Sequence, residues 1–537
     1  MCKSLTLFLL ALSSTYAKVL LSEELLTKDE NILNELENKG KIFIDLPTNK
    51  PPVNEHTQVN EDYENSNSIN GDLDSNSSEK TQIKIDNGTA LILTPYVENG
   101  QIAEAREASK VNSDYFLGVE SYSGFFTVNK TYDSNIFFWY FPVENKQVNE
   151  TPWIIWLQGG PGASSLTGLF DEIGPIRVNK FGKMKRNPYT WVQNHSVLFI
   201  DNPVGTGYSF TNHVDGYVSD MKTPFQYSKH LLSTVEQFLQ VFPELRTAPL
   251  YIAGESYAGK YVPALGTELH KAKTRLNLDV NLKGFIIGNA YIEPSMIRNV
   301  NHPFYYFGLL NKEQLKSVHP LMEEFRAQID ANNSVAAHNN WSKVVSVLLL
   351  LSHQKQGYNF LKDELSVGAY ANILKSSEMK KAIHVGDINF EFINVTVNSK
   401  MGPDFLSSSK KMFQKLLAND YRVLSYCGQL DQLMSCLHSA KNHRTWLWPG
   451  AQEFKDSTRY PIMYENSLAG YYKSGGNLTE VVVRGAGHMV PVDKPASAQV
   501  LVANWIRGLP IATPYTLVEQ FYLHTLLKNN FALYSYL

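Results

Sequence analysis

Short runs of β-branched and aromatic residues alternate with a helical pattern from about residue 115 onward, and this alternation constrains the fold more than any other feature. The runs that predict strands are 118–128, 136–143, 153–157, 197–201 and 250–253. Between them, 223–242 carries the partly amphipathic stripe of a helix. Strands separated by helices favour a mostly parallel central sheet with helices on both faces, so the sequence predicts an α/β fold.

The composition of the 537 residues is that of a globular protein, with 43% hydrophobic and 19% charged side chains. This excludes wholly disordered, collagen-like and coiled-coil chains. The formal net charge of −3 gives no electrostatic reason to expect an anionic membrane surface, and we expect no nucleic acid among the partners.

The first 17 residues read as a secretory signal peptide. Lys3 precedes an apolar run at 5–12, and Thr15-Tyr16-Ala17 provides a small-residue cleavage site. No later uncharged stretch approaches the roughly 20 residues that span a bilayer. We therefore expect passage through the secretory pathway to the cell exterior or to a lysosomal or vesicular lumen, with no stable membrane anchor.

An acidic segment follows the signal peptide. Residues 18–90 carry 15 Asp and Glu against 7 Lys, and 54–80 contain almost no large apolar residues. Such a chain cannot bury enough surface to offset its conformational entropy. We interpret 18–105 as a largely flexible leader or propeptide, 106–515 as the folded domain and 516–537 as a C-terminal tail without an assigned role.

The mature chain keeps two cysteines, Cys427 and Cys436, because Cys2 is lost with the signal peptide. The sequence leaves open whether they form a disulfide or stay as buried thiols. In a secreted chain each Asn-x-Ser/Thr sequon is a candidate glycosylation site. The sequons begin at Asn76, Asn87, Asn129, Asn149, Asn194, Asn332, Asn340, Asn394 and Asn477.

The strongest chemical signal lies in 250–260, where an apolar run leads through Gly254, Ser256 and Ala258 into a helix-capable stretch. A strand, a sharp turn and a helix are the context of a nucleophile elbow, which would raise the hydroxyl of Ser256 above the sheet edge. Ala258 stands where Gly is more usual, and a Ser between small residues is often a plain turn or a helix N-cap.

A serine nucleophile needs a base and an acid, and in this context they follow in the order Ser, Asp, His. The apolar run 423–426 ends shortly before Asp431, and 481–483 leads into a Gly-containing segment with His488. Taken singly, each residue is more often structural. Three strand-end residues in the required order favour a catalytic triad of Ser256, Asp431 and His488.

The loop 158–165 follows the strand predicted at 153–157 and is rich in Gly. Glycines let backbone N–H groups approach a substrate oxygen, as an oxyanion hole requires. The loop lacks the Lys-Ser/Thr ending of a P-loop and the spacing of a dinucleotide fingerprint, which argues against a nucleotide site. The chemistry needs neither a metal nor an organic cofactor.

Together these motifs resemble the serine carboxypeptidase family, and most of all its vitellogenic and vitellogenic-like carboxypeptidases. The motifs are QGGPGASS at 158–165, DNPVGTGYSF at 201–210, GESYAGKYVP at 254–263 and GHMVP at 487–491. The resemblance implies an α/β-hydrolase fold with a helical cap inserted at about 291–400. It also implies a secreted or lysosomal serine-type carboxypeptidase that acts on peptide and protein C-termini through an acyl-enzyme. A homodimer stays an open alternative.

Carried onto this chain, the resemblance makes Ser256 the nucleophile, His488 the general base and then acid, and Asp431 the residue that orients the imidazole. The oxyanion donors are the backbone N–H groups of Gly160 and Tyr257.

The resemblance also implies that the substrate's terminal carboxylate is bound by Glu172, Glu255, Gln158 and the backbone of Gly159. Gln158 stands where Asn is usual in the family. Two carboxyl groups in contact do not both ionise easily, so the pair can hold a proton at mildly acidic pH and donate it in a hydrogen bond to that carboxylate. At higher pH the ionised pair would repel the same group. We therefore expect activity to favour acid conditions.

Two departures from the family pattern leave the catalytic groups intact. Ala163 replaces a common Cys, so the disulfide made there in relatives cannot form, and Cys427 stands where many relatives have Asn. Two other functions stay open: an esterase or acyltransferase on the same scaffold, and a non-catalytic glycoprotein that binds or protects a partner.

Overall fold

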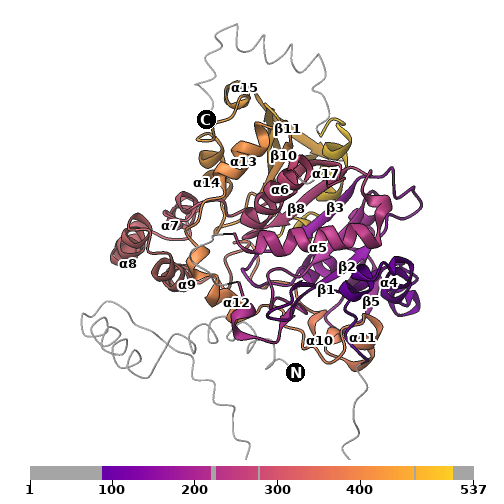
Figure 1. Cartoon of the computed structure of the whole chain (residues 1–537). Helices are drawn as coiled ribbons and strands as arrows, with labels where there is room; N and C mark the ends of the chain where they lie inside the picture. The colour runs from indigo at the N-terminus through magenta and orange to yellow at the C-terminus, as the bar shows by residue number, and fades with distance from the viewer. Residues whose placement is uncertain (1–87, 219–224, 276–277, 465–466, 512–537) are drawn as a thin grey trace, which may run out of the picture. The chain divides into compact units, whose positions relative to one another are not determined.

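The computed structural model describes residues 88–218, 225–275, 278–464 and 467–511 (Figure 1). An 11-stranded sheet runs through it in the order β1-β2-β6-β3-β8-β9-β10-β13-β12-β11, with β7 paired to β2. Its strands are β1 (Tyr122–Asn129), β2 (Ser134–Phe141), β3 (Trp153–Leu157), β6 (Ser196–Ile200), β7 (Phe210–Thr211), β8 (Leu250–Glu255), β9 (Leu282–Gly288), β10 (Arg422–Gly428), β11 (Arg459–Tyr464), β12 (Ser467–Gly475) and β13 (Leu478–Val483). A separate hairpin pairs β4 (Ile176–Val178) with β5 (Met184–Arg186).

The middle of the sheet is parallel and its two edges are antiparallel. Strands β6, β3, β8, β9, β10 and β13 run in one direction, whereas β2 and β12 run against their neighbours. All residues of β3 and β8 are buried, as expected for central strands covered on both faces. This is the arrangement of an α/β hydrolase.

Helices cover both faces of the sheet, as Figure 1 shows for α5 and α6 on the nearer side. Ile252 of β8 belongs to an apolar cluster with Phe238 of α5 and Val262 of α6. Its neighbour Tyr251 points to the other face, where its ring lies 5.7 Å from that of Trp505 in α17. These helices are α5 (Tyr227–Val241), α6 (Ala258–Arg275) and α17 (Pro495–Arg507), with α14 (Cys436–His443), α15 (Ala451–Asp456) and α16 (Val490–Asp493) between β10 and α17.

A mostly helical insertion separates β9 from β10, where the predicted cap lies. Its helices are α7 (Asn301–Tyr306), α8 (Lys312–Asp330), α9 (Ser334–Leu351), α10 (Ala371–Leu374), α11 (Ser377–Ala382) and α12 (Val395–Lys400), followed by α13 (Lys410–Leu417). In Figure 1, α7, α8 and α9 group on one side of the sheet, away from α10 and α11.

The folded unit begins before the boundary predicted at residue 106. Helices α3 (Thr94–Glu98) and α4 (Ile102–Ser109) precede β1, and Leu93 and Ala105 are fully buried. Leu93 N–H donates to the Phe125 carbonyl at 2.8 Å, so this stretch pairs with β1. The expected leader over 18–105 is therefore wrong for its last part, because an apolar run at 90–93 adds to the core.

Several predictions from the sequence lie outside the described residues. They are the signal peptide 1–17, the leader up to 87, the sequons at Asn76 and Asn87, and the tail 516–537. Within the described part of the chain, no helix combines the length and the apolar character needed to cross a bilayer.

Candidate active site

The three predicted triad residues follow three strands of the parallel centre. Ser256 comes directly after β8, Asp431 follows β10 and His488 follows β13. In the sheet, β8 and β10 flank β9, and β13 lies next to β10. Because the carboxyl ends of parallel strands meet at one edge, all three residues lie at the same edge of the sheet.

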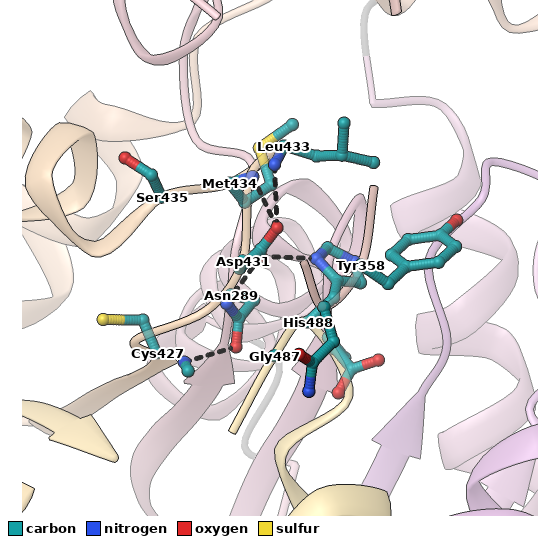
Figure 2. Close-up of polar contacts among 12 residues, drawn as sticks. Asn289, Tyr358, Cys427, Asp431, Leu433, Met434, Ser435, Gly487 and His488 are labelled. Carbon is teal, nitrogen blue, oxygen red and sulfur yellow. Dashed lines mark hydrogen bonds and ion pairs between the residues drawn. The ribbon is translucent and has the colours of Figure 1, made fainter. Parts of the chain in front are cut away.

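Asp431 and His488 are in direct contact (Figure 2). Oδ2 of Asp431 lies 2.6 Å from Nδ1 of His488, and both side chains are buried. Oδ1 of Asp431 accepts the backbone N–H groups of Leu433 at 2.8 Å and Met434 at 3.1 Å. Since the carboxylate accepts at Nδ1, that nitrogen carries the proton, and Nε2 is left as the basic nitrogen.

Asn289 is a further residue of the site, and the sequence analysis missed it. It follows β9 and is fully buried. Its Nδ2 donates to Oδ2 of Asp431 at 2.6 Å, while its Oδ1 accepts the N–H of Gly428 at 3.1 Å. Asn289 thus links the acid to the end of β10 and fixes the carboxylate that holds His488 (Figure 2).

Ser256 occupies a sharp turn with the geometry of a nucleophile elbow. Its φ of 61° lies in the left-handed region, which non-glycine residues rarely adopt. Gly254 is needed there, because a Cβ would lie 2.5 Å from the Leu157 carbonyl oxygen and 2.6 Å from Cβ of Ala258. Among the hydrogen bonds of the described residues, none joins the Ser256 hydroxyl to His488.

The Gly-rich loop after β3 packs directly on this turn. A Cβ on Gly159 would lie 2.6 Å from the Tyr257 nitrogen and 2.7 Å from Cβ of Ser256, so only glycine allows the approach. Within the described residues, the backbone N–H groups of Gly160 and Tyr257 donate to no other group. Unpaired backbone donors in the loop and the turn are what an oxyanion hole requires.

Buried hydrogen bonds hold the Gly-rich loop in place. Oδ1 of Asp201 accepts from the Ser164 hydroxyl at 2.7 Å and from the Ser165 N–H at 2.8 Å. Oδ2 of Asp201 accepts from the Tyr208 N–H at 2.9 Å. Burial raises the pKa of Asp201 to about 6, although these three hydrogen bonds act to lower it. The loop and the segment after β6 are thereby tied together.

Glu172 and Glu255 form a buried carboxyl pair next to the turn. Both are 1% exposed, and each carboxyl group shifts the pKa of the other, so the two groups are neighbours. Nε2 of Gln158 donates to Oε1 of Glu255 at 3.2 Å, and Oε1 of Gln158 accepts from Trp156 Nε1 at 2.9 Å. Burial raises the pKa of both carboxyl groups. The negative charges of Glu172 and Asp431 raise the pKa of Glu255 further, and that of Asp171 adds to the raised pKa of Glu172.

The unpaired oxygens of this pair indicate a shared proton. If both groups were ionised, both oxygens of Glu172 and Oε2 of Glu255 would be buried without a hydrogen-bond donor. One proton between the two groups removes this conflict, because the protonated group donates to the other. Glu172 ends the short π-helical turn η2 (Gly168–Glu172), which is a local geometry that sequence patterns do not reveal.

A disulfide closes the loop that carries Asp431. Cys427, near the end of β10, is bonded to Cys436, the first residue of α14, with 5.6 Å between their Cα atoms. The ring encloses Asp431 and the two N–H groups that bind its Oδ1. The sequence had left open whether these cysteines pair.

One predicted glycosylation site is contradicted by the structure. Asn394 is 8% exposed, and its Oδ1 accepts the N–H of Val397 at 2.9 Å as the N-cap of α12. A glycan needs an accessible amide, so the expectation for Asn394 is wrong. The other described sequons are exposed or half-buried: Asn129, Asn149, Asn194, Asn332, Asn340 and Asn477.

A family model described as serine carboxypeptidase matches residues 112–508. The chain belongs to the serine carboxypeptidase family. Human probable serine carboxypeptidase CPVL is 36% identical over 442 residues, which cover 79% of this chain and 91% of that protein. The vitellogenic carboxypeptidase of Aedes aegypti is 35% identical over 444 residues, covering 78% and 90%. The resemblance seen in the sequence motifs is therefore confirmed.

A solved structure agrees with this assignment at the level of fold. Kex1Δp, a prohormone-processing carboxypeptidase from Saccharomyces cerevisiae, matches with a TM-score of 0.66 at 22% identity, covering 75% of this chain and 96% of that one. This chain thus has the predicted α/β-hydrolase fold.

Proposed function

We propose that this family member hydrolyses the C-terminal peptide bond of peptides and proteins through Ser256, His488 and Asp431. The contact between Asp431 and His488, the strained turn at Ser256 and their common sheet edge support this assignment. We place its action in the secretory pathway, outside the cell or in a lysosomal lumen. The predicted signal peptide and the Cys427–Cys436 disulfide support that compartment.

The proposed reaction has two steps. The Ser256 oxygen attacks the scissile carbonyl carbon while Nε2 of His488 takes the hydroxyl proton, and the resulting oxyanion accepts from the N–H groups of Gly160 and Tyr257. The C–N bond then breaks as His488 returns the proton to the leaving amino group. Water attacks the acyl-enzyme with the same base, and the shortened peptide leaves as Ser256 regains its proton. Asp431 holds the imidazole throughout.

The buried carboxyl pair carries the proposal of exopeptidase specificity. Glu255 immediately precedes Ser256 in the chain, so a group bound by the pair lies close to the nucleophile. A shared proton, the amide of Gln158 and the N–H of Gly159 together offer donors to a terminal carboxylate. A substrate without that carboxylate would leave these buried groups unmatched.

The same pair supports an acid preference. Burial raises the pKa of both carboxyl groups, and the negative charge of Glu172 raises that of Glu255 further, so the pair keeps a proton under mildly acidic conditions. Once the pH rises through this raised pKa, the second carboxyl ionises, the donor is lost and the negative charge repels the substrate carboxylate.

The direct test compares a blocked dipeptide with a free C-terminal carboxylate and the same dipeptide as its amide. We expect rapid release of the C-terminal residue from the free acid, little from the amide, and none in Ser256→Ala. Ser317→Ala, at an exposed position of α8, is the matched control and should behave as the parent. Equal turnover of acid and amide would instead favour the esterase or acyltransferase alternative, and no turnover of either would favour a binding role.

A further inference from the structure

A segment of the cap bridges the two loops that carry Asp431 and His488. Residues 356–362, here called the clasp, lie between α9 and α10. On the side of the acid, the Gln432 N–H donates to the Gly357 carbonyl at 3.3 Å, and the Phe360 N–H donates to the Leu430 carbonyl at 3.4 Å. The clasp therefore holds the backbone on either side of Asp431.

The clasp also contacts the loop of His488. The His488 N–H donates to the Tyr358 carbonyl at 2.6 Å, and the ring of Tyr358 lies 4.7 Å from the imidazole (Figure 2). Gly487 permits this approach, since a Cβ there would lie 2.1 Å from the Tyr358 oxygen. One short segment thus sets the position of both loops relative to each other.

A buried glutamine makes the clasp a defined turn. Oε1 of Gln356 accepts the N–H groups of Tyr358 at 2.6 Å and Asn359 at 3.0 Å. Its Nε2 donates to the carbonyls of Asn359 at 2.7 Å and Lys362 at 2.6 Å. All four polar contacts lie inside the clasp, so Gln356 stabilises the turn from within.

Asp493 joins the clasp to the loop of His488. It is the last residue of α16, and its side chain is 8% exposed. Its Oδ2 accepts both the N–H of Gly487 at 2.7 Å and Nδ2 of Asn359 at 2.8 Å. Its Oδ1 forms an ion pair with Lys362. One carboxylate therefore fixes the residue before His488 and the clasp at the same time.

We propose that Asp493 is a positioning residue of the reaction: by pinning the clasp to Gly487, it sets the placement of the His488 imidazole between Asp431 and Ser256. The inference rests on the proposed triad. The rate of proton transfer depends steeply on the placement of the reacting groups, and a displacement of about 1 Å lowers the rate on the order of 100-fold. Without the carboxylate acceptor, the Gly487 N–H and the Asn359 amide lose their common partner, and the histidine loop can shift.

The test compares Asp493→Ala with the conservative Asp493→Asn, and uses Asp330→Ala as the matched control. Asp330, the last residue of α8, forms an exposed ion pair with Arg298, and such pairs contribute little to stability. Two rates are measured: inactivation by a fluorophosphonate, which needs an activated serine but no bound peptide, and turnover of the blocked dipeptide. Circular dichroism and thermal unfolding establish that each variant is folded.

For Asp493→Ala we expect both the inactivation rate and kcat to fall by about 10- to 100-fold, with KM within about twofold of the parent. Asp493→Asn keeps an oxygen acceptor toward Gly487 and Asn359, so it should restore both rates to within about threefold of the parent. Parent-like rates in Asp493→Ala would overturn the proposal, as would a loss in Asp493→Asn as large as that in Asp493→Ala.

Should Asp493→Ala not fold, Asn359→Ala decides by the same measurements, since it removes the clasp side of the shared contact and leaves Asp493 in place. Unchanged rates there would also overturn the proposal. A parent that reacts with the fluorophosphonate but releases no C-terminal residue would reject the proposed function, whereas the inactivation rates would still test the role of Asp493.

Discussion

Glu172→Gln separates the shared-proton account from a purely structural role of the carboxyl pair. Glutamine keeps the size of the side chain and an N–H donor, but it cannot ionise. In the parent, raising the pH ionises the second carboxyl of the pair. In the variant, the amide at position 172 offers its donor at every pH.

The structure sets the expected size of the effect. Both carboxyl groups are 1% exposed, so water screens them little. Loss of a hydrogen bond to an ionised substrate group costs about 1.5–3 kcal/mol. At about 1.4 kcal/mol per tenfold, KM of the parent for a free-acid substrate should rise by about 10- to 150-fold as the pair ionises.

The assay measures kcat and KM for a blocked dipeptide between about pH 4 and about pH 8. We expect a steep rise of KM with pH in the parent and a change of less than about threefold in Glu172→Gln, whose donor persists. The amide of the same dipeptide lacks the repelled carboxylate and controls for titration elsewhere. Parallel KM profiles for parent and variant would refute the shared proton.

Three further predictions follow from single contacts. Asn289→Ala removes the donor to Asp431 and should lower kcat by about tenfold or more, measured by single-turnover kinetics; an unchanged kcat would contradict its positioning role. Cys436→Ser opens the loop that starts at Cys427, and a loop of about ten residues predicts a loss of about 2–3 kcal/mol in unfolding free energy, measured by denaturant titration; an unaltered midpoint would argue against this contribution. Burial raises the pKa of the Glu172 carboxyl in the folded protein above its ordinary 4.5, so the stability that this group contributes is complete below pH 4.5 and is lost as the pH rises through the raised pKa. The melting temperature should therefore fall with rising pH more steeply in the parent than in Glu172→Gln. Equal slopes would contradict this contribution of Glu172.

The buried parallel strands could be predicted from the sequence because they are continuous apolar runs. The run 153–157 coincides with β3, and 250–253 lies within β8. By contrast, β9 was missed because Gly284 and Gly288 interrupt its pattern. Both glycines are required by close packing, since a Cβ on Gly284 would lie 2.6 Å from the Arg422 carbonyl oxygen.

That omission also hid Asn289, which directly follows β9. A lone Asn in an apparent loop does not indicate a functional role from sequence alone. The structure indicates one, because Nδ2 of Asn289 donates to Oδ2 of Asp431 at 2.6 Å. Ser256, Asp431 and His488 were different, because each follows a recognisable strand and their order matches a known chemistry.

The groups proposed to bind the substrate carboxylate could be predicted from the family resemblance but not from the sequence pattern. Glu172 lies on a π-helical turn, and its contact with Glu255 joins segments far apart in the chain. The clasp was missed for a related reason: the bond from the His488 N–H to the Tyr358 carbonyl uses backbone atoms, which every residue has. Side-chain patterns do not predict such contacts.

The most direct test of the triad is to locate the fluorophosphonate adduct by peptide mass spectrometry. We expect one adduct, on Ser256, that forms quickly in the parent and is nearly absent in His488→Ala, because the hydroxyl needs the imidazole to lose its proton. Labelling of Ser256 at the same rate without His488, or labelling of a different serine, would contradict the account.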